Sequence, residues 1–408
     1  MTALRLVLLA LAVLGAVLRP YRLPAFAAPV LLSVLALATG ATSWQRAGHD
    51  LRPLVDPLAF LLAAIPLAVL LDRLGYFEQL AELAEQRRGL VAGLWTLAAA
   101  TVAVLNLDAA VVLLTPLYVR VARKVHVPAR YLGFQPVILA LLASSFLPVS
   151  NLTNLIAVAR TGVGPVAFVE HLGLPGAVAC IVGYWCYRAS AKAVGGDDVA
   201  GPVGALRPQG AQPEVPRDSR AILVGSAVVA MVLVGFVLGP SFGIREWMVA
   251  LGADAVLVAL VRSAPLDRIP WGTALVAAGL GVLAGAAVQG LPLASLFHGG
   301  GVLATLRIAG ATAAGANVVN NLPALLVSLP FVGAHGSCRL WPALLGVNLG
   351  PSLLVTGSLA SLLWAESMRN LGEPVHAAQF LKVGLRVGLP ATVAALAVLV
   401  AMAPLFGC

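Results

Sequence analysis

Long apolar runs alternate with short polar connections along most of the chain. Twelve runs have roughly the length of a transmembrane helix and fall at 3–18, 25–42, 54–71, 89–117, 131–159, 172–187, 221–238, 247–261, 271–290, 302–332, 340–364 and 386–405. Three of them (89–117, 131–159 and 302–332) are too long, and too polar near the middle, for one simple helix, and 340–364 is similar. The pattern predicts helices that are interrupted within the membrane.

The composition supports this interpretation. Of the 408 residues, 60% are hydrophobic and only 11% are charged, whereas about 25% of the residues of a soluble domain are charged. The 41 glycines and 27 prolines suit packed, interrupted helices and not a strand-only barrel. The net charge is +9. In a membrane protein, the excess Lys and Arg residues are expected in cytoplasmic loops, where they set the orientation of the protein in the membrane. Lipid is therefore the expected surroundings, and we expect no nucleic-acid partner.

The N-terminal run has features of a signal peptide, with Arg5 before it and AFA at 25–27 after it. Because Arg19 and Arg22 follow the run and a second apolar run begins at once, we predict a first transmembrane helix. The four cysteines show no CxxC and no metal-ligand spacing, and are interpreted as small apolar residues of helices. The sequence also lacks a GxxxxGK[ST] loop. We expect neither a cofactor nor a metal, and any use of ATP would require a partner.

A repeat divides the chain. The segment WTLAAATVAVLNLDAAVVLLTPL (95–117) matches RIAGATAAGANVVNNLPALLVSLP (307–330), and GFQPVILALLASSFLPVSNLTN (133–154) matches RLWPALLGVNLGPSLLVTGSLA (339–360). The matches pair Asn106 with Asn320, Pro116 with Pro330, Pro136 with Pro342, and Ser150 with Thr356. The Gly-, Pro- and charge-rich stretch 188–220 separates the two copies and is typical of a linker.

These matches predict four parts: N-terminal transmembrane helices (1–53), a first repeat (54–187), a cytoplasmic linker (188–220) and a second repeat (221–408). Most of the 26 Lys and Arg residues fall on one side if 89–117 and 302–332 are re-entrant hairpins and 118–130 is cytoplasmic. The repeats are then inverted. The predicted fold is an all-α polytopic membrane protein in which each repeat has a re-entrant helical hairpin and a broken transmembrane helix, with about ten full crossings.

Polar residues interrupt each copy twice, at 105–109, 150–154, 317–323 and 356–361. Such breaks are tolerated at membrane depth only where they face protein or a wet cavity, and in secondary transporters they form the substrate site near the midplane. Their amides and hydroxyls can cap freed backbone groups and also bind a small polar solute. The candidate substrate-binding residues are Asn106, Ser150, Asn151, Thr153, Asn154, Asn317, Asn320, Asn321, Thr356 and Ser358. Capping alone, or coordination of sodium, is the alternative.

Two acidic residues lie deep in apolar runs. Asp108 occupies the first hairpin tip and Asp254 lies midway along 247–261. Because desolvation disfavours a charged carboxyl group, both are candidates for proton coupling. The alternatives are that Asp108 is an ionised cap of a helix and that Asp254 makes a polar contact within the bundle.

The segments SNLTNLI, NNLPALL and GVNLGPSLLVTGSLASLLW resemble the arsenite permeases of the ion transporter superfamily. The resemblance implies export of arsenite, and of antimonite, across the inner (plasma) membrane, driven by the proton motive force. It also allows a soluble ATPase subunit and a homodimer. The divalent anion–sodium symporters of the superfamily carry Ser-Asn-Thr at both tips. Here the tips read Asn106-Leu107-Asp108 and Asn320-Asn321-Leu322, which favours the arsenite branch.

Other functions remain open at the level of sequence. The alternatives within the superfamily are a sodium-coupled transporter of sulfate or a dicarboxylate, and a sodium–proton antiporter. An intramembrane hydrolase would need His/Asp or Ser/His pairs at depth, and no histidine falls inside a predicted run. A purely structural scaffold would not need four polar breaks. We therefore expect a secondary transporter and not an enzyme.

Overall fold

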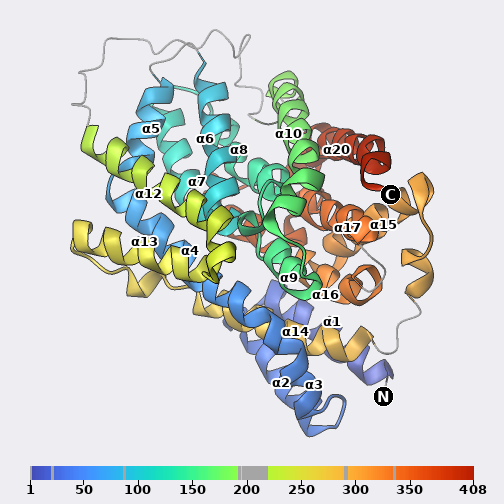
Figure 1. Ribbon diagram of the computed structural model, residues 1–408. Coiled ribbons are helices and arrows are strands. Elements are labelled where there is room, and N and C mark those ends of the chain that lie inside the picture. Colours follow the sequence, from blue (N-terminus) through green and yellow to red (C-terminus); the bar gives the residue numbers. More distant parts are fainter. Residues whose placement is uncertain are drawn as a thin grey trace.

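The computed structural model describes residues 2–19, 23–85, 89–191, 194, 219–288, 293–333 and 337–408, and these residues are almost entirely helical (Figure 1). Residues 192, 193 and 195–218, most of the predicted linker, lie outside the described ranges. Within those ranges, six helical stretches are long and apolar enough to cross a membrane, and four shorter helices are also apolar.

The runs predicted as single helices are confirmed. They form α1 Thr2–Leu18, α2 Ala27–Ala38, α4 Val55–Arg73, α10 Pro165–Ala189, α12 Ser219–Leu238, α13 Glu246–Val261, α14 Trp271–Val288 and α20 Leu389–Met402, which α19 Ala377–Val383 precedes. Three short helices were not predicted: α3 Trp44–Leu51, α5 Tyr76–Glu85 and α19. Each of them contains charged residues, so none appears as an apolar run.

The four interrupted runs are also confirmed. Single asparagines separate α6 Leu90–Leu105 from α7 Leu107–Lys124, and α15 Gly301–Val319 from α16 Asn321–Val332. Pairs of 3-10 turns separate α8 Ala129–Leu142 from α9 Leu152–Thr161, and α17 Ser337–Leu349 from α18 Leu359–Asn370. The order helix, asparagine, helix, then helix, two turns, helix, therefore occurs twice in the described chain.

The backbone repeats at the breaks. Asn106 has φ 99° and ψ 148°, and Asn320 has φ 81° and ψ 153°. Asn151 and Ser358 are both extended N-caps, with φ −149° and −142°. This correspondence pairs Ser150 with Gly357, so the sequence match of Ser150 with Thr356 is wrong by one position. The two sequence segments differ too much for identity alone to fix the register.

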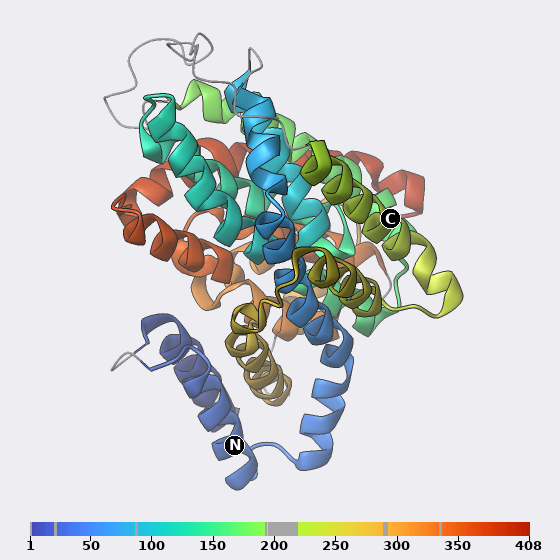
Figure 2. The same cartoon turned by 90° about the vertical axis from the view of Figure 1, so that its left-hand side faces the viewer.

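Helices α1, α2 and α14 pack together at one end of the molecule, with α3 beside α14 (Figures 1 and 2). A Cβ at Gly279 of α14 would lie 2.7 Å from the carbonyl carbon of Pro29 in α2, so glycine permits this close packing. On other sides of the molecule, α4 packs on α13, α10 on α20, and α15 on α17.

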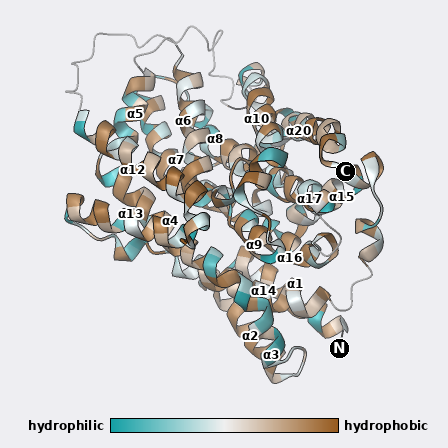
Figure 3. Cartoon of the chain, in the orientation of Figure 1, coloured by the Kyte–Doolittle hydropathy of each residue, from teal (hydrophilic) through white to brown (hydrophobic). Residues whose placement is uncertain are grey.

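Large apolar side chains cover outward faces of the molecule. Leu223 and Val234 of α12 and Leu251 of α13 are more than half exposed, and hydrophobic residues dominate these helices in Figure 3. A soluble monomer rarely exposes so many large apolar side chains. The chain is a multi-pass membrane protein.

Two expectations are corrected. Cys338 and Cys408 form a disulfide that joins the start of α17 to the segment after α20, so only Cys180 and Cys186 are free. Their separation of 70 residues hides this pairing from a search for local motifs. In addition, His171 lies within α10, because that helix begins at Pro165, before the apolar run. His171 stacks between Trp341 and Phe406, at ring distances of 4.2 and 3.8 Å.

Candidate functional site

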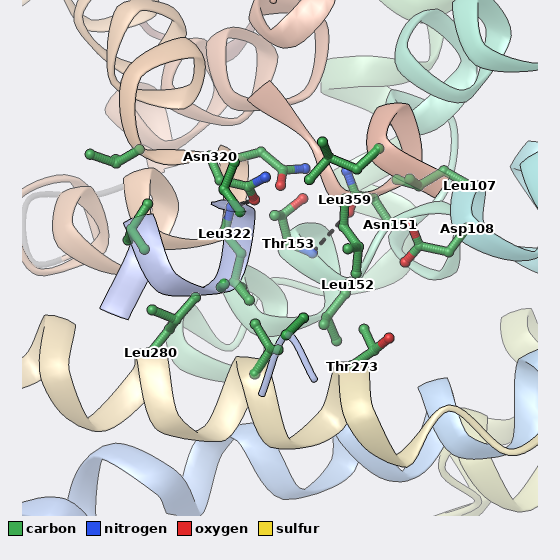
Figure 4. A pocket seen from close by; sticks show the side chains of 18 residues that line it. Leu107, Asp108, Asn151, Leu152, Thr153, Thr273, Leu280, Asn320, Leu322 and Leu359 are labelled. Atoms are coloured by element: carbon green, nitrogen blue, oxygen red, sulfur yellow. Dashed lines mark hydrogen bonds between the residues drawn. The ribbon is translucent and has the colours of Figure 1, made fainter. Parts of the chain in front are cut away.

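Four helix N-termini meet at one cavity, which we call the central cavity. Its walls include the first residues of α7, α9, α16 and α18, together with residues of α1 and α14 (Figure 4). The cavity holds about 60 Å³, well below the roughly 300–1,000 Å³ of pockets for drug-sized ligands. Each helix N-terminus carries a partial positive charge of about half a unit. The site is therefore small, and the positive ends of four helix dipoles lie at its wall.

Side chains at the breaks cap these four helices. The Oδ1 atoms of Asn106, Asn151 and Asn320 accept hydrogen bonds from the amides two residues later, at 2.9, 3.1 and 3.4 Å. Ser358 Oγ accepts from the amide of Ser361 at 3.1 Å. Asn, Ser, Thr and Asp are favoured as N-caps for this reason. The capping that the sequence suggests is present, and it positions the start of each helix at the cavity.

Asn348 of α17 connects the two halves. Its Oδ1 accepts from Asn151 Nδ2 at 3.0 Å and from Thr153 Oγ1 at 2.9 Å. Its Nδ2 donates to Asn154 Oδ1 at 2.7 Å and lies 3.4 Å from Ser145 Oγ. All these groups are buried. The side-chain amide of Asn348 thus donates and accepts hydrogen bonds, and these bonds stabilise the break between α8 and α9.

The remaining polar groups of the first break bond to its own backbone. Ser150 Oγ donates to the carbonyls of Ser144 and Leu147, and Asn154 Nδ2 donates to the same two carbonyls at 2.7 and 3.2 Å. Unwinding between α8 and α9 frees these carbonyls. Ser150 and Asn154 therefore stabilise the break and do not reach the cavity.

In the second half, the hairpin tip binds the broken helix. Asn320 Nδ2 donates to the carbonyl of Thr356 at 3.1 Å, and Asn317 Nδ2 donates to the carbonyl of Gly350 at 2.7 Å. Asn317 Oδ1 accepts from the amide of Leu354 at 3.0 Å. The tip between α15 and α16 is thereby fixed to the link between α17 and α18.

Asp108 lies in the first turn of α7 and lines the central cavity (Figure 4). It is 6% exposed, and within the described part of the chain its Oδ1 has no hydrogen-bond partner. The Nδ2 of the adjacent Asn106 is also buried without a partner there. Since an unpaired buried polar group is costly, Asp108 is available to a solute or a proton, and the amide of Asn106 is available to a hydrogen-bond acceptor.

The predicted site residues divide into three groups. Those that line the central cavity are Asp108, Asn151, Thr153, Asn320 and Asn321. Those that support it through the contacts above are Asn106, Ser150, Asn154, Asn317 and Ser358. Thr356 contributes its carbonyl, and its side chain is exposed. Asp254 lies elsewhere, in α13, facing a separate cavity beside α4.

Sequence reasoning did not select Asn348, Ser145 or Ser361, nor Thr273 of α14, which lines the cavity. The available signal for Asn348 was an isolated amide within the apolar helix that precedes the second break. Among the described residues that line the cavity, Asp108 is the one acidic side chain and none is basic. No group of three or more His, Cys, Asp or Glu side chains comes together in the described ranges.

A multi-pass helical protein with broken helices around a cavity that polar side chains help to line has the architecture of a membrane transporter. The chain belongs to the CitMHS (citrate transporter) family, whose model matches residues 1–356.

Relatives agree with this class. The chain is 30% identical over 190 residues to an uncharacterised transporter of Mycobacterium tuberculosis. The matched region covers 42% of this chain and 44% of that protein. It is 25% identical over 193 residues to a 46 kDa membrane protein of Mycobacterium leprae (43% and 45%). It is 26% identical over 203 residues to the arsenical pump membrane protein of Escherichia coli (45% and 47%). The matched region spans less than half the length of each relative.

Proposed function

We propose that the protein is a secondary transporter that exports arsenite, and antimonite, from the cell, driven by the proton motive force. The observation that carries this proposal is the central cavity: about 60 Å³, with amide and hydroxyl groups and one carboxyl group among its described lining residues. The proposed location is the plasma (inner) membrane. A soluble ATPase subunit and a homodimer remain part of the proposal.

The chemistry of the cavity suits arsenous acid. At neutral pH this solute is a small uncharged trihydroxide, so it needs hydrogen-bond donors and acceptors and no cationic clamp. Asn320, Asn321 and Thr153 supply neutral polar groups at the cavity, and the first residues of four helices lie at its wall. Each amide side chain can both donate and accept. These groups match a hydroxylated neutral solute better than a large anion.

Asp108 is the proposed proton carrier. Its Oδ1 is buried and has no hydrogen-bond partner among the described residues, and it lines the same cavity as the proposed substrate groups. Burial disfavours the charged carboxylate. The simplest way to couple proton movement to solute export is exchange at one site. A proton on Asp108 and a bound solute would then exclude each other.

The two copies of broken elements support an inverted-repeat mechanism. The matched backbone angles at Asn106 and Asn320, and the matched N-caps at Asn151 and Ser358, are what internal symmetry produces. In such transporters, one set of repeats moves against the remaining helices and exposes a midplane site alternately to each side. We propose that α1 and α14, which close the central cavity, form the wall that the broken helices move against.

Citrate, or another carboxylate, is the second candidate, with proton or sodium coupling. The family match favours it, and four helix N-termini would attract an anion. Against it stand the volume of the cavity and the absence of a basic side chain among the described residues that line it. A tricarboxylate would need either a bound cation or a wider cavity.

Transport into everted vesicles from cells without an arsenite pump tests the proposal. We expect arsenite uptake that a proton uncoupler abolishes and that citrate, with or without Mg²⁺, does not inhibit. An Asn321→Leu variant loses a polar group of the cavity and should take up less arsenite, and vesicles without the protein are the control. Citrate uptake without arsenite uptake would replace the leading candidate with the second one. Dependence on sodium instead of protons would contradict the proposed coupling.

A further inference from the structure

A second cavity lies between α4 and α13, and the connection from α13 to α14 closes one end of it. It holds about 410 Å³, and its walls are mostly aliphatic, with side chains such as Leu62, Leu70 and Leu251. None of the residues that line it also lines the central cavity. Its volume falls in the range of about 300–1,000 Å³ that is typical of sites for small organic ligands.

One carboxyl group faces this apolar space. Asp254 lies in the middle of α13 and is 8% exposed, and its Oδ1 has no hydrogen-bond partner among the described residues. It is the one ionisable side chain among the described residues of the lining. Burial of an isolated carboxyl group in apolar surroundings is costly unless the group finds a partner.

Two cations at the ends of α4 and α13 already have partners. Arg245 Nη1 lies 2.7 and 2.9 Å from the two carboxylate oxygens of Asp56, and Arg73 Nη1 donates to Ser263 Oγ at 2.6 Å. The carboxyl group of Asp254 is thus available to a ligand.

Two aromatic rings complete the cavity. Trp247 and Trp271 both line it, and Trp247 Nε1 donates to Asp56 Oδ1 at 3.2 Å, which fixes the orientation of that ring. Indole rings are the best aromatic partners for organic cations. A carboxyl group and two indoles in an aliphatic cavity form an acceptor for an amine with an apolar body.

We propose that the cavity between α4 and α13 binds a lipophilic amine, whose ammonium group pairs with Asp254. The neutral amine enters from the lipid, since Leu251, Leu266 and Trp271 at the cavity are 54%, 71% and 59% exposed. The carboxyl proton of Asp254 then passes to the amine nitrogen, so the ion pair forms without any net charge entering the membrane. A neutral lipid tail would leave Asp254 unpaired, a hydrophilic cation would find no other polar partners, and an anion would find no cationic partner among the described residues of the lining.

Equilibrium binding of tritiated N,N-dimethyldodecylamine to the full-length protein in lipid nanodiscs tests this proposal, with empty nanodiscs as the background. We expect one saturable site that dodecanol, of equal chain length, does not displace. In Asp254→Asn the affinity should fall roughly tenfold or more, because a buried charge pair is lost. Glu170→Gln is the matched control, since Glu170 lies beside another apolar cavity, and it should bind like the wild type.

A second variant separates the site from the fold. Ala255→Trp fills the cavity, keeps Asp254 and changes a residue on the exposed side of α13, and it should also remove the saturable binding. Three results would overturn the proposal: no saturable site on the wild type, displacement by dodecanol equal to that by the unlabelled amine, or unchanged binding in both Asp254→Asn and Ala255→Trp.

Discussion

Asn151 Nδ2 donates a hydrogen bond to Asn348 Oδ1 at 3.0 Å across 197 positions of sequence. Asn151 is the N-cap of α9 in the first half, and Asn348 lies in α17 of the second half. This bond joins the two halves directly behind the wall of the central cavity. The buried amide network that it belongs to leads to the first prediction.

Replacement of Asn348 by Leu should lower the free energy of unfolding by about 1–3 kcal/mol, because it leaves buried polar groups of Asn151, Thr153 and Asn154 unpaired. Thermal unfolding in detergent measures this loss. Thr153→Val provides the other arm of a double-mutant cycle. We expect a coupling energy above about 0.5 kcal/mol, as for residues in contact, and strictly additive effects would contradict the network.

Replacement of Asp108 by Asn should reduce the uncoupler-sensitive uptake roughly tenfold or more, equivalent to at least about 1.4 kcal/mol of lost stabilisation. The carboxamide has nearly the same shape but cannot take up a proton. The remaining uptake should be insensitive to the proton gradient. Comparison with Asp254→Asn decides which of the two acidic residues carries the coupled proton, since Asp254 lines the other cavity. Loss of coupling in Asp254→Asn alone would assign the coupled proton to that residue.

Asn320 has φ 81°, a conformation that costs a residue with a side chain about 1–3 kcal/mol. Asn320→Gly and Asn320→Ala both lose the bonds to Thr356 and Leu322, but only Gly also relieves the backbone strain. We expect Asn320→Ala to have the lower unfolding temperature of the two, and both to lose transport. The same order is expected at Asn106, where φ is 99°. An alanine variant as stable as the glycine variant at both positions would refute this.

The disulfide predicts the number of reactive thiols. Under denaturing conditions without a reductant, a maleimide should modify only Cys180 and Cys186, and reduction should add Cys338 and Cys408. A gel shift with a polymer-linked maleimide counts the adducts. Because disulfides persist in oxidising compartments, a membrane-impermeant reductant added to intact cells should open this bond. The predicted inversion of the repeats puts the segment at Cys338 on the side opposite to 118–130, that is, outside the cell. Protection from that reductant would contradict this orientation.

Much of the fold could be predicted from the sequence. The apolar runs determine where helices form, since each spanning segment must satisfy its backbone hydrogen bonds internally. The polar breaks at 105–109, 150–154, 317–323 and 356–361 coincide with observed interruptions, because Asn, Ser and Thr cap helix ends better than they continue helices. Asn106 and Asn320, which the sequence match pairs, each connect two helices and both have positive φ.

The sequence alone could not decide which polar residues share a cavity. Asp108 and Asp254 both appear as acids in apolar helices, yet one lies where four helix N-termini meet and the other faces aliphatic walls. Asn348, Cys338 and His171 gain their partners only when distant helices pack. Local periodicity and capping depend on residues a few positions apart and can therefore be predicted from the sequence. Contacts between distant segments depend on the packing of helix faces, and only the tertiary structure determines them.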